Sequence, residues 1–410
     1  MKILWVKANK LLPIHSGGDI RSFNIARRLS IRHELAFFSY YDGLPDGNYD
    51  AELPKHFPRA LSVCTGKSDS GTIKRGLDYL LHLPVAAPYA VSRFASAVVR
   101  RQLQGWFDEQ RFDVAVCDFL DAAVNFPKKL TIPTVLFQHN VETEIWRRHA
   151  ETESNPIRKM IYRMEFAKML RYEQKIVREY QHVIAVSEND KKLMSQWTDE
   201  SRIAVVPTGV DLRQYRPEPV PREVGPLVMF VGAMDWEPNI DAVEYFCDEI
   251  WSQVLAAVPE ARFRIVGRNP DRRVQKFASS SVEVTGRVAS VIDHLRDAAV
   301  VIVPLRIGGG TRLKIYEAMA AGKAVVSTSI GAEGLDVNHG RDILLADTQR
   351  EFAESIIRFL RDRQLRSNFE RAAAELAVKY DWSAIGDKFS VVLEAVAENR
   401  THFAEQYAHS

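Results

Sequence analysis

Short apolar runs alternate with longer amphipathic stretches along the whole chain. In the first half, the apolar runs predict buried strands at 3–6, 35–39, 114–117, 134–137 and 183–186. The second half predicts strands at 227–231, 263–266, 282–285, 300–303 and 324–327. The stretches between them predict helices that include 18–32, 92–107, 155–180, 240–258 and 291–298, with a tail helix at 383–399. This alternation predicts an α/β fold with two doubly wound parallel sheets.

The chain is expected to divide into two large domains, because its 410 residues are too many for one ordinary core. Four prolines interrupt any periodic pattern between Arg213 and Pro226, which marks the seam. We therefore predict an N-terminal domain over 1–212, a C-terminal domain over 213–380 and a final helix over 381–410. Ligands of doubly wound sheets bind at the carboxyl ends of the strands, so the expected site is the cleft between the domains.

Composition and charge narrow the class of function. The formal net charge of +2 gives no polycation that would suggest nucleic acid. The three cysteines, at 64, 117 and 247, lack metal-ligand spacing and suit a reducing compartment. The apolar run at 3–6 is too short for a signal peptide, and no run is long enough to span a bilayer. We therefore expect a cytoplasmic protein that does not bind nucleic acid.

The segment from Pro304 to Gly322 carries the strongest functional signal. It follows the predicted strand at 300–303, and three glycines then break the pattern: Gly308, Gly309 and Gly310. Thr311 can cap the helix that follows, and Gly322 can end it. A strand, a glycine loop and a helix N-terminus form an anion site, because free backbone N–H groups and the helix dipole point at the loop.

Three charged residues in the same segment define the anion further. Arg312 and Lys314 place positive charge at the start of the helix, which is the unfavourable end of its dipole, so helix stability does not explain them. A bound polyanion does. Glu317 lies one turn after Lys314 and can accept hydroxyl groups. The motif therefore predicts a ligand with a diphosphate beside a ribose or another sugar.

Further candidates follow predicted strands of the first half. Gly17 and Gly18 open the first long helix, where small residues allow a phosphate to approach the backbone. His139 follows the strand at 134–137, where it can bond a substrate hydroxyl or serve as a structural hydrogen-bonding residue. Arg21 is expected to be a surface or interdomain charge of the first helix.

The order and spacing of these motifs resemble the retaining glycosyltransferases of family four. The resemblance rests on five pieces of the chain: Gly17–Gly18, His139, Ser187–Asp190, Pro207–Asp211 and Glu317–Gly322. It implies the GT-B fold, in which two Rossmann-like domains face each other. The N-terminal domain would bind the acceptor and the C-terminal domain the nucleotide-sugar donor. In such enzymes the last helix often crosses back to brace the first domain.

The resemblance implies a role for each candidate in the second domain. The glycines at 308–310, Thr311 and the following helix would hold the donor phosphates, while Arg312 and Lys314 would neutralise the charge of the leaving group. Glu317 would accept the ribose hydroxyls. The base would meet the backbone of the loop after the strand at 282–285, which is formed by Arg287 and Val288.

The resemblance also implies a mechanism. Gly17 and Gly18 would close over the diphosphate from the first domain, and His139 would touch the transferred sugar. The departing phosphate takes the proton of the acceptor, so no dedicated base is required. The chain has no Asp-x-Asp pair, which is the usual metal-binding signature of the other glycosyltransferase fold. We therefore expect no metal and no cofactor apart from the nucleotide sugar itself.

Two departures from the family pattern change this picture. The family usually has a Glu eight positions before Glu317, where this chain has Gly309. It also usually places an Arg and a Lys in the segment that corresponds to Ala233–Asn239, which has neither. We interpret Arg312 and Lys314 as replacements for that charge. Residues two apart on a helix point roughly 200° apart, so both reach one diphosphate only if Arg312 lies in an irregular first turn. Otherwise Lys314 pairs with Glu317.

The motifs, together with this resemblance, predict a retaining, metal-independent hexosyltransferase of polysaccharide biosynthesis. The acceptor would be a saccharide, a lipid-linked sugar or a small molecule. Two alternatives remain: a sugar-nucleotide epimerase with His139 as its base, and a catalytically degenerate subunit that only binds nucleotide sugar. The helix at 155–181 carries seven basic and three acidic residues. It is either a solvated face or a peripheral contact with the inner face of a membrane.

Overall fold

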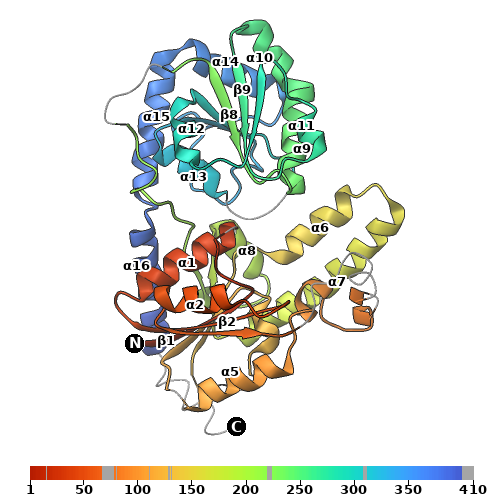
Figure 1. The fold of residues 1–410 in the computed structure, drawn as a ribbon, viewed down its shortest axis with the longest axis vertical. Helices are drawn as coiled ribbons and strands as arrows, with labels where there is room; N and C mark the ends of the chain where they lie inside the picture. The colour runs from red at the N-terminus through yellow and green to blue at the C-terminus, as the bar shows by residue number, and fades with distance from the viewer. Residues whose placement is uncertain are drawn as a thin grey trace. The chain divides into compact units, whose positions relative to one another are not determined.

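The computed structural model describes residues 1–14, 16–66, 78–79, 81–109, 111–127, 130, 132–218, 224–307 and 312–398. The chain forms two compact units (Figure 1). The first unit comprises Met1–Pro207 and the chain from Ser383 onward, and the second comprises Thr208–Trp382. The sequence places these two boundaries after Leu212 and after Tyr380 instead.

The first unit is built on a seven-stranded sheet with the order β3-β2-β1-β4-β5-β6-β7. Its strands are all parallel and comprise β1 (Lys2–Ala8), β2 (Glu34–Tyr41), β3 (Arg59–Cys64), β4 (Val114–Asp118), β5 (Thr134–Phe137), β6 (His182–Ala185) and β7 (Ile203–Val205). The strand order reverses between β1 and β4, and β5 pairs with β4 on the far side. The carboxyl ends of these three strands therefore lie side by side, at the place where such sheets bind ligands.

Helices cover this sheet and complete its core. They include α1 (Gly17–Leu29), α2 (Gly47–His56), α4 (Tyr89–Ser92), α5 (Ala97–Glu109), α6 (Glu142–Thr152), α7 (Pro156–Glu179), α8 (Glu188–Met194) and α16 (Trp382–Glu398). The ring of Phe389 in α16 lies 5.6 Å from that of Trp5 and 5.0 Å from that of Phe137, measured between centroids. Arg28 of α1 also donates two hydrogen bonds to Asp387. The last helix is thus part of the first unit.

Helices α6 and α7 form a hairpin that extends away from the sheet of the first unit (Figure 1). Trp146 and His149 of α6 pack against Tyr162 of α7, with ring centroids 6.1 and 5.5 Å apart. Glu173 of α7 is fully buried and accepts the backbone N–H of Thr143 at 2.8 Å. This bond satisfies one of the N–H groups that the first turn of α6 leaves without an intrahelical partner. The hairpin is therefore held by aromatic packing and by this buried cap.

The second unit contains a six-stranded parallel sheet with the order β10-β9-β8-β11-β12-β13. Its strands are β8 (Leu227–Val231), β9 (Arg262–Val266), β10 (Val282–Gly286), β11 (Val300–Val303), β12 (Ala324–Ser327) and β13 (Leu344–Leu345). Its helices include α9 (Glu237–Tyr245), α10 (Trp251–Ala257), α11 (Arg272–Gln275), α12 (Val291–Asp297), α13 (Leu313–Ala320), α14 (Gln349–Arg361) and α15 (Arg363–Val378). The order reverses between β8 and β11, so their carboxyl ends mark the switch point of this sheet.

The predicted strands are confirmed, and the sequence missed β3, β7 and β13. These three are outermost strands of their sheets; β7 and β13 are apolar but only three and two residues long, and polar residues interrupt β3. The predicted helix at 240–258 is interrupted by a π-helical stretch, Phe246–Ile250. The predicted helix at 92–107 is wrong at its start, because α4 ends at Ser92 and α5 begins at Ala97. Within the described part of the chain, no helix is both long and apolar enough to cross a membrane.

Candidate functional site

The start of α13 differs from the expected arrangement. Arg312 is the N-cap residue, with an extended backbone (φ −93°, ψ 90°). The helix thus begins one residue later than a cap at Thr311 would give. Because Arg312 stands outside the helix, the helical angle between its side chain and that of Lys314 does not separate them. Four predicted phosphate-binding residues lie outside the described residues: Gly308, Gly309, Gly310 and Thr311.

Lys314 turns toward the carboxyl end of β8. Its ammonium Nζ donates a hydrogen bond of 2.9 Å to Oδ1 of Asn239 and lies 4.4 Å from the centre of the Phe230 ring. Burial lowers the pKa of Lys314 to about 7; Arg312 lowers it further, and Glu317 opposes the shift. The direct partner of the ammonium is therefore a neutral amide rather than the carboxylate of Glu317.

Asn239, in the first turn of α9, is fixed for this contact by the loop that precedes the helix. Its side chain is almost fully buried, and its amide nitrogen donates to the carbonyl of Ala233 at 2.9 Å. A Cβ atom at Gly232 would lie 2.6 Å from the Asn239 amide, so this close approach requires a glycine. The segment 233–239, which lacks the expected cations, thus supplies the acceptor that holds Lys314.

Arg312 reaches the same loop from the other side of the helix start. Its guanidinium lies 5.4 Å from the ring of Trp236, and the residue is only 7% exposed. Trp236 itself is 42% exposed. Contact between a guanidinium and an aromatic face is favourable and is compatible with hydrogen bonds from the guanidinium edge to an anion. Arg312 and Lys314 therefore both contact the segment 230–239, which runs from the end of β8 into the first turn of α9.

Glu317 lies one turn further along α13 and is half-buried. Burial raises its pKa, while the hydroxyl of Tyr215, which donates a hydrogen bond to the carboxyl group, and the charge of Lys314 oppose the rise. The helix then ends at Gly322, whose positive φ of 68° is the left-handed conformation that the sequence predicts for this stop. Glu317 thus has a partner within the fold that a ribose hydroxyl would join or replace.

Arg287 and Val288 follow β10, at the outer edge of the second sheet. Arg287 is exposed and Val288 is half-buried. Strand β9 separates β10 from β8, whose Phe230 contacts Lys314. The loop therefore lies along the same carboxyl edge as the two cations but two strands away from them.

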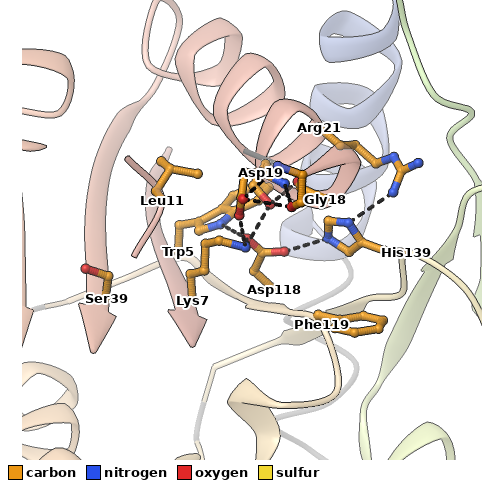
Figure 2. A network of polar contacts seen from close by, with 12 residues as sticks. Trp5, Lys7, Leu11, Gly18, Asp19, Arg21, Ser39, Asp118, Phe119 and His139 are labelled. Carbon is orange, nitrogen blue, oxygen red and sulfur yellow. Dashed lines mark hydrogen bonds and ion pairs between the residues drawn. The ribbon is translucent and has the colours of Figure 1, made fainter. Parts of the chain in front are cut away.

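His139 lies at the centre of a buried network in the first unit (Figure 2). Its Nε2 is 2.7 Å from Oδ1 of Asp118, and its Nδ1 is 3.0 Å from Nη1 of Arg21. Phe119 and Phe137 pack around the imidazole, with ring centroids 5.2 and 4.5 Å away. Burial lowers the pKa of His139 to about 4, because the charge of Asp118 only partly offsets the lost hydration. The imidazole is therefore neutral at physiological pH.

Asp118 is the other centre of this network. It accepts a hydrogen bond of 2.9 Å from the indole Nε1 of Trp5, and its carboxylate lies 3.6 Å from the ammonium of Lys7. Lys7 also lies 3.5 Å from the carboxylate of Asp19. Burial alone would raise the pKa of Asp118, but Lys7 and the bond from His139 hold it well below its usual range. The carboxylate is therefore charged at physiological pH.

Gly17 and Gly18 are the first two residues of α1. Ser16 caps the helix by accepting the N–H of Asp19, whose carboxylate in turn accepts from the backbone of Ser16. The N–H groups of the two glycines have no intrahelical partner at such a helix start. A Cβ atom at Gly18 would lie 3.4 Å from Nδ1 of His139. The helix start and the imidazole are thus immediate neighbours, although the negative charge of Asp19 does not favour a phosphate there.

Sequence reasoning missed four residues that complete these sites: Asp118, Asn239, Tyr215 and Arg21, the last of which is only 3% exposed rather than at the surface. Asp118 and Asn239 follow the same rule as His139, because each ends or follows a strand at its carboxyl end. Tyr215 lies in the proline-rich seam, where the sequence has no periodic pattern. Asp118 and Asn239 could have been found from the rule that ligands bind at the carboxyl ends of parallel strands, whereas no sequence pattern marks Tyr215.

Comparisons with known proteins identify the class. Residues 17–214 match the model of Glycosyltransferase Family 4, and residues 225–362 match that of Glycosyl transferases group 1. Together the two matches cover most of the chain. The chain therefore belongs to the family-four glycosyltransferases, and the resemblance drawn from its motifs is confirmed.

Relatives and solved structures agree with this assignment. The chain is 27% identical over 331 residues to a phosphatidyl-myo-inositol mannosyltransferase of Mycolicibacterium smegmatis, covering 77% of this chain and 79% of that protein. It is 22% identical over 239 residues, 54% of this chain, to an N,N'-diacetylbacillosaminyl-diphospho-undecaprenol alpha-1,3-N-acetylgalactosaminyltransferase of Campylobacter jejuni, covering 61% of that protein.

Two solved structures share the fold. Sucrose-phosphate synthase of Thermosynechococcus elongatus superimposes with a TM-score of 0.70 at 16% identity, covering all of both chains. The Anabaena protein HepE, solved in complex with UDP, gives a TM-score of 0.66 at 15% identity, covering 96% of this chain and 100% of HepE. The predicted α/β class and the GT-B fold are thereby confirmed.

Proposed function

We propose that this protein is a retaining hexosyltransferase that moves a sugar from a nucleoside diphosphate to a saccharide or lipid-linked acceptor. The observation that carries the proposal is the group of Arg312, Lys314 and Glu317 at the start of α13. Two cations and a carboxyl group at the switch point of a doubly wound sheet suit a diphosphate beside a ribose. HepE, which has the same fold, was solved with UDP and with UDP-glucose.

In this proposal the second unit binds the donor. Arg312 and Lys314 stabilise the negative charge that develops on the departing diphosphate, which is the main electrostatic task of the reaction. Glu317 accepts ribose hydroxyls, and the backbone of Arg287 and Val288 meets the base. The cations perform the role that a metal ion has in other transferases, so we propose that the reaction needs no metal.

The first unit supplies His139, which contacts the transferred sugar, and the start of α1 at Gly17 and Gly18. The departing phosphate takes the proton of the acceptor, and the new bond forms on the face that the diphosphate leaves. Retention of the anomeric configuration follows from this geometry. The occupied ring nitrogens of His139 count against its use as the base of an epimerase.

We further propose that the α6–α7 hairpin touches a membrane that carries the acceptor. Ile157 and Met160 in the first turns of α7 are each 67% exposed, and Arg158 and Arg163 lie beside them. Exposed apolar side chains next to basic ones suit an anionic lipid surface. Two of the relatives carry names with a lipid acceptor, phosphatidyl-myo-inositol and diphospho-undecaprenol. Salt-sensitive binding to phosphatidylglycerol vesicles is expected, and equal sedimentation with neutral phosphatidylcholine vesicles would sink this idea.

A thermal-shift screen tests the donor assignment directly. UDP-glucose, UDP-N-acetylgalactosamine and GDP-mannose are compared with the corresponding nucleosides, because a bound donor raises the unfolding temperature by mass action. The matching donor is then incubated with saccharide and lipid-linked acceptors, with and without EDTA. Retained anomers and unchanged turnover in EDTA are expected. Conversion of the donor without an acceptor would indicate an epimerase, and binding without any turnover would indicate a degenerate subunit.

A further inference from the structure

Both ring nitrogens of His139 are occupied by protein groups of different character. Nδ1 lies 3.0 Å from the guanidinium of Arg21, and Nε2 lies 2.7 Å from the carboxylate of Asp118 (Figure 2). A guanidinium has only N–H donors, so Nδ1 must be the acceptor. The ring proton then resides on Nε2, from which it is donated to Asp118. The two partners thus select a single tautomer of the neutral ring.

A protonated ring conflicts with the same surroundings. A proton on Nδ1 would face the N–H donors of Arg21 and add a second positive charge beside it. The charged groups around the imidazole come from four elements: Lys7 of β1, Asp19 and Arg21 of α1, Asp118 of β4, and Asp190 of α8, which faces Arg21. Two cations meet three carboxylates, so the network is negative overall as long as His139 stays neutral.

We propose that Arg21 and Asp118 are positioning residues that hold His139 as an uncharged ring, with its proton on Nε2, beside the sugar that is transferred. This inference rests on the proposed function. Sugar transfer builds positive charge on the anomeric carbon, and a cationic imidazole would oppose that charge, whereas a neutral ring in a negative network does not. Arg21 and Asp118 do not touch the substrate themselves.

Nuclear magnetic resonance of the free protein tests the ring state without any substrate. The ring C–H signals of His139, assigned by their loss in His139→Ala, are expected to stay constant between pH 5 and pH 8. In Arg21→Met the ring keeps Asp118 but loses the opposing guanidinium. The pKa of His139 should therefore rise, and its signals should begin to shift at the acidic end of that range, because one charge that lowers the pKa is removed while Asp118 remains. Arg21→Lys retains the positive charge and should keep the ring neutral.

A matched control is available on the same helix. Arg27 is exposed, and its guanidinium lies over the ring of Phe23. Arg27→Met makes the identical substitution and should leave the titration of His139 unchanged. Titration of His139 in the wild-type protein between pH 5 and pH 8, or an unchanged pKa of His139 in Arg21→Met, would overturn the inference.

Kinetics separate positioning from a merely structural role. In Arg21→Met, kcat should fall about tenfold at one pH unit below the new pKa of His139 and recover above it, since about nine tenths of the rings are charged at the lower pH. The donor KM should change little, and Arg21→Lys should restore the wild-type pH profile. A loss of kcat that is equal at every pH would contradict positioning. If the resonance results are as expected but the protein converts no nucleotide sugar, the positioning of His139 is supported and the proposed glycosyl transfer is wrong.

Discussion

The two units hold their buried charges in opposite ways. In the first unit, each charge of the network around His139 has an opposite charge nearby, with Lys7 between the carboxylates of Asp19 and Asp118. In the second unit, Lys314 is held by the neutral amide of Asn239 and by the ring of Phe230. Among the residues that the structure describes, the charges of the first site are paired with one another, whereas the ammonium of Lys314 contacts an amide and an aromatic ring.

This difference indicates what each site is prepared to do. A buried ion pair offsets part of the cost of losing water, and it fixes the geometry of the groups that it joins. A buried ammonium without a carboxylate in contact has a lowered pKa, and an anionic ligand restores the lost interaction. The first network therefore suits the positioning of an uncharged ring, and the second suits the binding of a diphosphate.

The largest expected effect is on the stability of the first unit. Asp118→Ala removes one of the two carboxylates beside Lys7 and leaves the N–H groups of Trp5 and His139 buried without their acceptor. Breaking a buried pair in this way costs about 3–5 kcal/mol. Lys314→Met removes an amine that is already partly neutral, so it should leave stability unchanged or raise it. Calorimetric unfolding of both variants measures the contrast, and equal losses would show that the two sites do not differ.

The second expected effect concerns the affinity for the donor. Arg312→Ala and Lys314→Ala should each weaken nucleoside diphosphate binding roughly ten- to hundredfold, because a charge-assisted contact contributes about 1.5–3 kcal/mol. The free nucleoside should be affected much less. The matched control is Lys323→Ala. Lys323 lies beyond the C-terminal end of α13, and its ammonium donates a hydrogen bond to the carbonyl of Arg296. Unchanged diphosphate affinity in both variants would end the hypothesis that they replace the missing Arg and Lys.

Glu317→Ala separates the ribose from the phosphates in the same calorimetric titration. Its proposed partner is ribose, so it should weaken the nucleoside and the diphosphate by a similar factor. A loss confined to the diphosphate would instead indicate that Glu317 acts by orienting Lys314.

Much of this could be read from the sequence, and the exceptions have physical causes. The central strands were predicted because strands buried on both faces form unbroken apolar runs. The edge strands β7 and β13 are too short to stand out, and polar residues interrupt β3. His139 and Lys314 were found because of their places at a strand end and after a glycine loop. Their partners were harder to find. Asn239 and Asp118 are distant in sequence from the residues that they hold, and only the strand order brings them together.

The third expected effect is a pH dependence of donor binding. Lys314 has a pKa of about 7 in the free protein, below that of an ordinary amine, and a bound diphosphate raises it. The complex therefore binds more protons than the free protein above pH 7. Affinity should be highest near and below pH 7 and should fall by up to about tenfold for each pH unit above it. A nucleotide sugar is the suitable ligand, because its diphosphate does not titrate there. Lys314→Met should abolish the dependence, and a flat wild-type profile would contradict it.

The smallest expected effect converts the second site into the type of the first. Asn239→Asp places a carboxylate where the amide now accepts from Lys314, at a distance of 2.9 Å. The ammonium gains an internal partner, so its pKa should rise and the pH dependence of donor binding should move to higher pH. The added negative charge should weaken diphosphate binding about three- to tenfold, or roughly 0.6–1.4 kcal/mol, because the ligand then competes with the introduced carboxylate for the same cation. Titration calorimetry at pH 7 and pH 9 measures both changes.

Asn239→Ser, which removes the amide without adding charge, is the control and should leave the pKa of Lys314 low. If Asn239→Asp binds the diphosphate as tightly as the wild-type protein, then Lys314 does not contact it, and the contrast between the two sites does not bear on function.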